Sequence, residues 1–491
     1  MKKIIISIAI FSALLASCEK FEDVNKNPNN VSETHPQLLL TSIEWSAFQV
    51  EGASPLFASR MIVQTDGEEA EQYYKWDRNS FDDYNNLRNV TKMMEEAKRI
   101  ENVSYQALAK FFRAYYFYNL TLKFGDIPYS GALQGESGDV YEPVYDQQKE
   151  VFAGILNELK EADELLNDDL IEGDIIYGGD PAKWRKLINS FRLKVLLTLS
   201  GKTSETDLAV VQSFASIVAN KELLESNEDN GQLMFVNQDG NRYTEYNSSS
   251  YGSARYMDST FIKRLQDRKD PRLFIFAGQT RVAKEAGLEI NDFAAYEGGN
   301  PVAPYNDVNL KAADGKVSKV NLRYTSDPTN EPHMILGYAE LQFILAEASV
   351  RGWITASDAK TYYENGVKAS FEFYNSYSDE YAEYVDGTAA TSYLDENLID
   401  FDNAVNDQER IERIITQKYL QSFLQGGWSA YYEHLRTGFP SFAFLPGLTP
   451  PTRWMYPNNE YLLNTEHVAE AIARQFGAGN DKTRELTWWL K

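Results

Sequence analysis

The sequence has 491 residues, in which 72 Asp and Glu against 48 Lys and Arg give a formal net charge of −24. This acidity argues against nucleic acid and anionic membrane surfaces as partners, because both repel a negatively charged protein. A single cysteine leaves no pair for a disulfide or a thiolate metal site, so stability has to come from a buried core, which a chain of this length can supply. Aromatic residues make up 13% of the chain, with 31 Tyr, and this content favours interfaces or a site that stacks against a ligand.

The first residues have the three parts of a secretory signal. Two lysines precede an apolar run from Ile4 to Leu15, and small residues then lead to Cys18. The run is too short to span a bilayer, which needs about 20 apolar residues. Leu-Ala-Ser-Cys resembles the lipobox of bacterial lipoproteins, in which the peptide is cut before the cysteine and the cysteine is lipidated; an ordinary cleaved signal is the alternative. We therefore expect residues 1–17 to be a signal peptide and Cys18 to hold the protein at the membrane, since two or more acyl chains anchor stably. No second long apolar run follows, so no transmembrane helix is expected.

Most of the remaining chain has apolar residues at helical spacing. Residues 18–24 are expected to be a tether and 25–35 a lead-in, because the run from Asn25 to Asn30 suits neither helix nor strand. Pro36 then begins a helix. Further helices are expected at about 81–100, 104–122, 151–166, 181–199, 204–220, 334–350, 355–375, 407–424, 427–436 and 465–475.

Local signals mark some of the helix ends. Asp180 is well placed as an N-cap and Pro181 as the first helical residue. Gly125, followed by Pro128, is typical of a helix stop, and residues 355–358 have the form of a capping box. These signals divide the chain into helices of about 15–20 residues that occur mostly in neighbouring pairs.

Residues 225–332 have a different composition, in which Gly, Asn, Asp, Ser and Tyr dominate. One short helix is expected at 258–267, and the rest should form long loops and short strands inserted into a helical protein. The paired helices predict a mainly α fold, with a helical-repeat scaffold such as tetratricopeptide repeats, although no clean 34-residue repeat is present. We expect one domain from residue 25 to residue 491.

The sequence lacks the common catalytic motifs. Its four histidines are far apart, and it contains no His-Glu-x-x-His, Gly-x-Ser-x-Gly, phosphate-loop or EF-hand pattern. We therefore expect no enzyme, no metal and no cofactor. A carboxylate pair such as a glycosidase uses could be present among so many acids, so a surface glycoside hydrolase stays open as a less favoured alternative.

The order of several short motifs resembles the SusD/RagB family of outer-membrane nutrient-binding lipoproteins, in its SusD-like branch. The motifs are Asp23-Val-Asn-Lys-Asn-Pro-Asn29, Lys123-Phe-Gly-Asp-Ile-Pro-Tyr129, Ile176-Tyr-Gly-Gly-Asp-Pro-Ala-Lys-Trp184, Asn189-Ser-Phe-Arg-Leu193, Glu340-Leu-Gln-Phe-Ile-Leu-Ala-Glu-Ala348, Gln417-Lys-Tyr419, Arg436-Thr-Gly-Phe-Pro440, Tyr456-Pro457 and Trp488-Trp489. They cover almost the whole chain after the lipobox. One departure is Gly426-Gly-Trp428, before which the branch has a longer, acidic segment.

The resemblance implies a scaffold of about four tetratricopeptide-like helix pairs, with the binding face on irregular loops and short strands. It implies a non-catalytic, surface-exposed lipoprotein of the outer membrane that covers a SusC-like TonB-dependent transporter barrel. The ligand would be an oligosaccharide or, in some relatives, a peptide. The acids just after Cys18 resemble the signal that sends such lipoproteins to the cell surface. Contact with the membrane would be through the lipid anchor only.

A glycan site needs flat rings for the apolar faces of sugars and polar side chains for their hydroxyl groups. Two loop segments offer both, on the expectation that their rings are exposed. The predicted ligand-binding residues are Tyr73, Tyr74, Trp76, Asp77 and Arg78 in the first segment, and Tyr243, Tyr246 and Tyr251 in the second. Burial of each ring in the core, or contact with the transporter, is an equally open interpretation.

Overall fold

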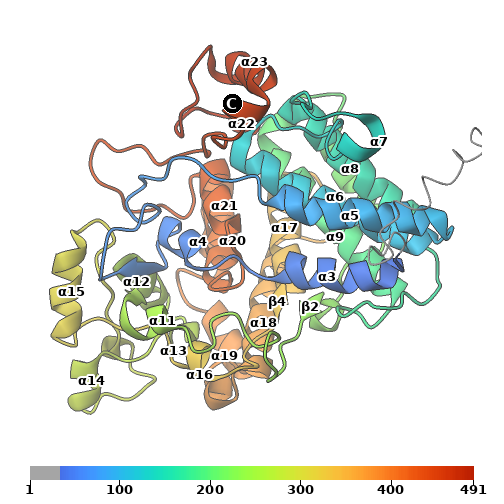
Figure 1. Ribbon diagram of the computed structural model, residues 1–491. Helices are drawn as coiled ribbons and strands as arrows, with labels where there is room; N and C mark the ends of the chain where they lie inside the picture. Colours follow the sequence, from blue (N-terminus) through green and yellow to red (C-terminus); the bar gives the residue numbers. More distant parts are fainter. Residues whose placement is uncertain (1–33) are drawn as a thin grey trace, which may run out of the picture.

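The computed structural model describes residues 34–491. The predicted signal peptide 1–17, Cys18, the predicted tether 18–24 and the predicted lead-in up to residue 33 lie outside the described residues. Within the described part, helices packed side by side form an array that occupies one half of the molecule (Figure 1). Its members are α3 (Pro36–Phe48), α5 (Asp83–Arg99), α6 (Val103–Phe124), α8 (Gln148–Leu165), α9 (Pro181–Thr198), α10 (Val210–Asn220), α17 (Tyr338–Val350), α18 (Ala359–Tyr377), α20 (Asp407–Gln421) and α21 (Ser429–Thr437).

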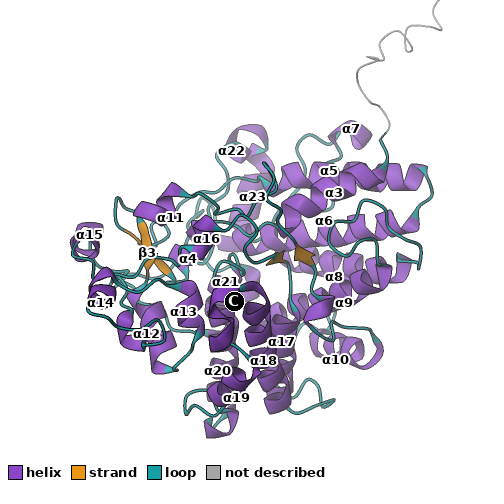
Figure 2. Ribbon diagram, turned by 90° about the horizontal axis from the view of Figure 1, so that it is seen from below, coloured by secondary structure: helices purple, strands orange, loops and turns teal. Residues whose placement is uncertain are grey.

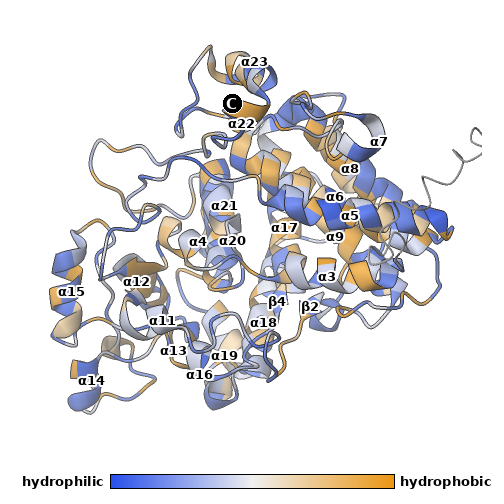
Figure 3. Cartoon of the chain, in the orientation of Figure 1, coloured by the Kyte–Doolittle hydropathy of each residue, from blue (hydrophilic) through white to orange (hydrophobic). Residues whose placement is uncertain are grey.

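The array follows the order of the chain. Helix α6 packs against α5 and α8, α8 packs against α9, and α9 reaches α17, which packs against α18 and α20. Helix α6 is buried along most of its length because it has helices on both sides. In Figure 3, α5 is mostly hydrophilic and α6 carries more hydrophobic residues. This agrees with an outer position for α5 and an inner position for α6. The predicted mainly α fold with paired helices is confirmed.

The cap signals at Asp180 and Gly125 locate the start of α9 and the end of α6 correctly. The carboxylate of Asp180 accepts hydrogen bonds from the backbone N–H groups of Ala182 at 2.9 Å and Lys183 at 3.4 Å, and Pro181 is the first residue of α9. The predicted capping box at 355–358 is wrong, because α18 begins at Ala359 with Asp358 as its N-cap. The helix predicted at 204–220 begins only at Val210, after a turn.

The loop-rich region contains more helix than predicted. Instead of a single helix, it holds α11 (Ser249–Ser253), α12 (Ser259–Asp267), α13 (Arg272–Phe276), α14 (Arg281–Glu285), α15 (Tyr305–Ala313) and α16 (Arg323–Ser326). Other short helices are α4 (Ala53–Ala58), α7 (Gly135–Gly138), α19 (Gly387–Leu394) and α22 (Glu460–Leu463), and α23 (Thr465–Phe476) follows near the C-terminus. Helices of four or five residues are too short to show a periodic apolar face, which explains why the pattern missed them. The nine-residue α15 was also missed, and it has a single buried residue, Val308.

The expected short strands form two separate antiparallel pairs (Figure 2). Strand β1 (Ile62–Gln64) pairs with β3 (Arg255–Met257), with Ile62 opposite Met257. Strand β2 (Gln232–Leu233) pairs with β4 (His333–Met334), with Gln232 opposite Met334. Each pair therefore joins the loop-rich region to a segment close to the helix array. No helix within residues 34–491 is long and apolar enough to cross a membrane.

Candidate functional site

A cavity of about 520 Å³ lies among helices from both ends of the chain. Its wall includes the end of α3 with residues 49–51, the start of α5, and parts of α6, α9, α17, α20 and α21. The volume is within the range of about 300–1,000 Å³ that is usual for small-molecule sites. Because its walls are far apart in sequence, the cavity exists only when the array is assembled.

Aromatic side chains form a large part of the wall. Tyr115 and Tyr116 of α6 have ring centroids 5.3 Å apart. Tyr432 of α21 meets Trp489 edge to face at 6.3 Å, and Trp428 precedes the same helix. Tyr115 is only partly buried, whereas the other four rings are buried. Flat rings of this kind can contact the apolar face of a sugar.

A tight turn between α20 and α21 places Trp428 in the wall. Gly427 has φ +48°, a left-handed conformation that glycine adopts without strain. A Cβ added to Gly426 would lie 2.5 Å from the Cβ of Ser422, so a larger residue would displace the turn. The two glycines therefore make the short connection between α20 and Trp428 possible.

Four of the aromatic residues in the wall carry a polar atom without a hydrogen-bond partner in the described chain. These atoms are the hydroxyl groups of Tyr116 and Tyr432 and the indole Nε1 atoms of Trp428 and Trp489. Burial raises the pKa of both tyrosines well above the usual value, so their hydroxyl groups stay protonated and able to donate. Each of these polar atoms has almost no accessible surface, so it lies behind the face that the ring presents to the cavity.

Charged side chains meet at one part of the wall. Lys123 of α6 has its Nζ atom 3.9 Å from Glu51 Oε2 and 3.8 Å from Asp83 Oδ2, and Asp82 precedes Asp83. Burial raises the pKa of Asp83; the nearby Lys123 opposes this shift, while Glu51 and Asp82 add to it. We call Glu51, Asp82 and Asp83 the acidic rim. It is a place where negative charge is only partly balanced.

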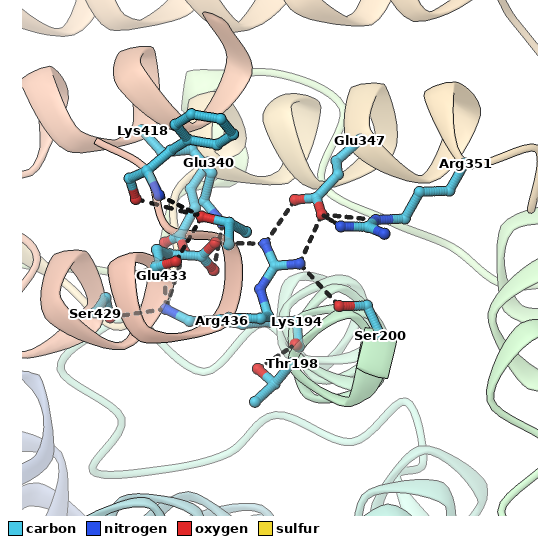
Figure 4. Close-up of polar contacts among 12 residues, drawn as sticks. Lys194, Thr198, Ser200, Glu340, Glu347, Arg351, Lys418, Ser429, Glu433 and Arg436 are labelled. Atoms are coloured by element: carbon cyan, nitrogen blue, oxygen red, sulfur yellow. Dashed lines mark hydrogen bonds and ion pairs between the residues drawn. The ribbon is translucent and has the colours of Figure 1, made fainter. Parts of the chain in front are cut away.

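Another side of the cavity is held by a buried ionic network (Figure 4). Arg436 of α21 makes two bonds to the carboxylate of Glu347 of α17, each 2.6 Å long, and it also contacts Glu433. Lys418 of α20 donates to Glu433 at 2.9 Å, and Arg351 lies 2.7 Å from Glu347. Burial alone would raise the pKa of Glu433, but Arg436 and Lys418 outweigh it and hold that pKa at about 2. The network therefore fixes three helices of the wall with paired charges.

The first predicted segment is mostly buried, which differs from the expectation of exposed rings. Tyr73, Tyr74 and Trp76 are 8%, 0% and 5% exposed. Trp76 stacks on Trp454 with ring centroids 5.3 Å apart. Polar loop composition did not reveal that these rings fold back onto the body, where the hydroxyl of Tyr74 donates to the Ala58 carbonyl at 2.9 Å. Their contribution to ligand binding stays a prediction.

The two polar members of that segment differ in environment. Asp77 is exposed. Arg78 is partly buried; its Nη1 donates to the Tyr456 carbonyl at 2.5 Å and to Asp481 at 3.1 Å, and its guanidinium lies 4.9 Å from the ring centroid of Tyr461. Arg78 is therefore occupied by contacts within the protein.

The second predicted segment is also mixed. Tyr243 and Tyr251 are buried, and Tyr243 packs against Phe235 and His333 with centroid distances of 5.3 Å each. Tyr246 is partly exposed below Arg242, whose guanidinium lies 5.4 Å from its ring centroid. The hydroxyl groups of Tyr243 and Tyr251 have no hydrogen-bond partner within residues 34–491.

The structure brings both predicted segments close to the cavity without placing them in its wall. Trp76 contacts the wall residue Trp428, with ring centroids 5.7 Å apart. In the second segment, Glu245 Oε1 is 3.8 Å from the position of a Cβ on Gly52, which follows Glu51 of the acidic rim. None of the eight predicted residues, all within the described part of the chain, lines the cavity.

Comparisons with known proteins identify the family. Residues 28–457 match the family model described as SusD-like, starch-binding, associating with outer membrane. A search of curated proteins gives no match. A SusD homologue from Bacteroides fragilis is 53% identical, with a TM-score of 0.90 over 94% of this chain and 100% of its own. A candidate outer-membrane nutrient-binding protein from Bacteroides vulgatus is 52% identical, with a TM-score of 0.90 over 93% of this chain and 100% of its own.

A second SusD homologue from Bacteroides fragilis is 35% identical, with a TM-score of 0.87 over 93% of this chain and 100% of its own. The family model and these structures agree over most of the described chain, and the resemblance seen in the short motifs is confirmed. Proteins of this family bind ligands and are not catalysts, so the hydrolase alternative falls. The chain belongs to the SusD-like family of outer-membrane nutrient-binding proteins.

Proposed function

We propose that this protein is a surface-exposed lipoprotein that captures an oligosaccharide in the central cavity and delivers it to a SusC-like TonB-dependent transporter barrel. The observation that supports capture there is the combination of aromatic rings with amide and charged side chains in the lining of one cavity. The lipobox at Cys18 supports the anchor, and membership of the family supports association with outer-membrane transport.

Tyr115 is the ring best placed to contact a ligand. It is partly exposed, lines the cavity and lies on the stable helix α6. A sugar ring stacked on Tyr115 would bury the apolar C–H groups of the sugar. The hydroxyl groups at the edge of that sugar could bond to Asn119 and to the acidic rim, which line the same cavity. Tyr73, Tyr74, Trp76, Asp77, Arg78, Tyr243, Tyr246 and Tyr251 remain proposed contributors, with Asp77 and Tyr246 having the more accessible side chains.

Capture can be tested with the purified protein lacking the signal peptide. Oligosaccharides and short peptides are screened on an array, and the best binder is titrated by calorimetry. We expect Tyr115→Ala to weaken its binding about tenfold or more, because losing one stacked aromatic side chain removes about 1.5–3 kcal/mol. Tyr362→Ala is the matched control, since Tyr362 is also a partly buried helix tyrosine but does not line the cavity. Equal effects of both variants would contradict capture in the cavity.

Delivery to a transporter requires a stable complex at the membrane. We expect the lipidated protein to co-purify with a large outer-membrane barrel from gently solubilised native membranes. Recovery of the protein only as a lone monomer, under conditions that keep other membrane complexes intact, would contradict this part of the proposal.

A further inference from the structure

We propose that residues 49–52 are a gate of the cavity and that His333 is the positioning residue that holds this gate closed. These residues, called the gate segment below, join α3 to α4, and Gln49, Val50 and Glu51 among them line the cavity. The inference rests on the proposed function where ligand entry is concerned, since it names what regulates access to the same cavity. Opening of the gate segment itself is tested without a ligand.

The gate segment lies where the lining of the cavity reaches the surface. The exposed residues of the lining are Ser46, Glu51, Ser80 and Asp82. Ser46 belongs to α3 and Glu51 to the gate segment, whereas the other two precede α5. Figure 1 shows α3 and α5 side by side. A mouth of the cavity therefore lies between the gate segment and the start of α5.

The backbone of the gate segment makes few hydrogen bonds. Within residues 34–491, its N–H groups donate a single one, from Val50 to Nδ1 of His333 at 3.1 Å. The carbonyl groups of Gln49, Val50 and Glu51 accept none from the same part of the chain. Segments with so few hydrogen bonds open locally, at a lower free energy than the helices around them. The bond to His333 is therefore the main backbone restraint on the gate segment.

Both ends of the gate segment are fixed to the body of the protein. Phe48 comes before it and is 1% exposed, and Ala53 comes after it and is 8% exposed. Helix α3 packs against α5 and α6, and α4 packs against β1 and α21. Movement is therefore confined to a few residues between two anchored helices, as in a small loop that closes a site.

His333 is a fixed hydrogen-bond acceptor. It lies in β4 and is buried, with its ring edge to face against Phe235 at 4.9 Å and Tyr243 at 5.3 Å. Burial lowers the pKa of His333 to about 3, so the imidazole is neutral at neutral pH. Because the Val50 N–H donates to Nδ1, the proton of the neutral ring is on Nε2. The packed rings fix the orientation of the imidazole and, through it, the position of Val50.

The contact on the cavity side of the gate segment is looser. Lys123 Nζ lies 3.9 Å from Glu51 Oε2 and 3.8 Å from Asp83 Oδ2, so Lys123 connects the gate segment to α5 across the mouth. Both distances are close to the limit for an ion pair, and the side chain of Glu51 is 46% exposed. Such ion pairs contribute little to stability. Lys123 thus draws the two sides of the mouth together, while His333 supplies the directional bond.

The opposite side of the mouth is held more firmly. The Met455 N–H donates to the Asp77 carbonyl at 3.0 Å, and Arg78 donates to the Tyr456 carbonyl and to Asp481. These bonds tie the residues that precede α5 to the C-terminal part of the chain. Opening of the mouth therefore comes from movement of the gate segment.

Hydrogen exchange of the unchanged protein, without a ligand, is the first test. Mass spectrometry at single-residue resolution compares the Val50 amide with amides in the middle of α6. We expect the Val50 amide to exchange by local opening, at a rate that low urea does not change, and the α6 amides to exchange only through global unfolding. Equal protection of the Val50 and α6 amides would overturn the inference, and this result does not depend on the folding of any variant.

Substitutions then separate the bond from the packing around it. His333→Leu removes the acceptor, and we expect exchange of the Val50 amide to become at least tenfold faster. His333→Asn offers Oδ1 in place of Nδ1 and should keep the exchange rate within threefold of that of the unchanged protein. Phe235→Leu is the matched control, because Phe235 is buried and contacts the same ring without touching the bond. Equal acceleration in His333→Leu and Phe235→Leu would overturn the role of His333.

Entry of a ligand is measured by binding kinetics. Maltohexaose, cellohexaose and the N-acetylglucosamine hexamer are the probes. For a probe that binds, we expect His333→Leu to raise the association rate constant at least threefold, because a larger fraction of molecules is open. His333→Asn and Phe235→Leu should leave it within twofold. Faster Val50 exchange in His333→Leu with an unchanged association rate constant would overturn the gate.

Failure of the gate and failure of the proposed function give different results. If Tyr115→Ala weakens binding of a probe but His333→Leu does not change its association rate constant, the proposed function stands and the gate fails. If none of the probes binds, exchange of the Val50 amide decides the inference: local opening that His333→Leu accelerates supports it, and protection equal to that of α6 overturns it.

Discussion

Trp76 packs edge to face against Trp428, with ring centroids 5.7 Å apart. Trp428 lines the cavity and Trp76 does not, so Trp76 lies one layer behind the wall. Trp76 also stacks on Trp454 and donates its indole N–H to the Arg453 carbonyl at 3.3 Å. Any influence of Trp76 on a ligand would therefore act through the position of Trp428.

Replacing Trp76 by Ala should destabilise the fold. Removing a large buried ring leaves a void, and such substitutions cost about 3–5 kcal/mol in the free energy of unfolding. We expect a loss in this range for Trp76→Ala by urea denaturation, with weaker ligand binding as a consequence of a displaced Trp428. Trp353→Ala, at a partly exposed tryptophan outside the cavity, should cost less. A stable Trp76→Ala protein with reduced binding would instead show direct contact with the ligand.

Sequence alone predicted the long helices because their signals are local. Asp180 and Pro181 fix the start of α9, and the apolar stripe that contains Tyr115 marks α6. A helix of five residues such as α13 (Arg272–Phe276) spans little more than one turn and has no capping side chain, so its pattern could not be separated from a loop.

The cavity was not predicted because its residues are ordinary helix residues. Tyr115 belongs to an apolar stripe whose members are usually packing, and nothing local separates it from its buried neighbours. Its approach to Trp428 and Glu51 depends on how helices far apart in the chain assemble. Conversely, the polar loop around Trp76 suggested exposure, but contacts with residues more than 350 positions away bury it.

The anchor prediction concerns a residue outside the described part of the chain. We expect Cys18→Ala to release the protein from the membrane fraction, because the lipidated cysteine would be its only attachment. Cell fractionation with detergent-free washes measures the released share. A Cys18→Ala protein that stays in the washed membranes would contradict the lipoprotein interpretation.

The ionic network around Arg436 predicts an asymmetric response to mutation. Removing one partner of a buried pair leaves the other charge unpaired and costs about 3–5 kcal/mol. Glu347 is 0% exposed and would keep only the partly exposed Arg351 as a partner, so Arg436→Ala should lower the free energy of unfolding by up to about 3–5 kcal/mol in urea denaturation. Arg351→Ala is the matched control: it contacts the same carboxylate from a side chain that is 28% exposed, and it should cost less than about 1 kcal/mol. Similar, small losses in both variants would show that the network does not hold the helices of the wall.

The contribution of Asp258 to the stability of the fold should fall as the pH rises. This buried N-cap residue of α12 accepts hydrogen bonds from the backbone N–H and the hydroxyl of Thr260, each 2.6 Å long, through Oδ1. Its Oδ2 has no hydrogen-bond partner within residues 34–491. Burial raises its pKa to about 7, although Thr260 and Arg60 oppose the shift. An unfolded Asp titrates near about 3.9.

Between about pH 4 and pH 7 the folded state therefore holds a proton that the unfolded state has lost, so this group's contribution to stability falls as the pH rises through that window. Asp258→Asn removes the charge and keeps a good N-cap. We expect its stability relative to the unchanged protein to increase from pH 5 to pH 8, by roughly 1–3 kcal/mol, since one pKa unit corresponds to about 1.4 kcal/mol. The exposed N-cap Asp358 is the control: its hydrogen bond from the Thr361 backbone N–H lowers its pKa, so its contribution to stability is complete above about pH 4, and the stability of Asp358→Asn relative to the unchanged protein should stay constant from pH 5 to pH 8. Urea denaturation at both pH values measures these differences, and the same pH dependence in the two variants would contradict the assignment of a raised pKa to Asp258.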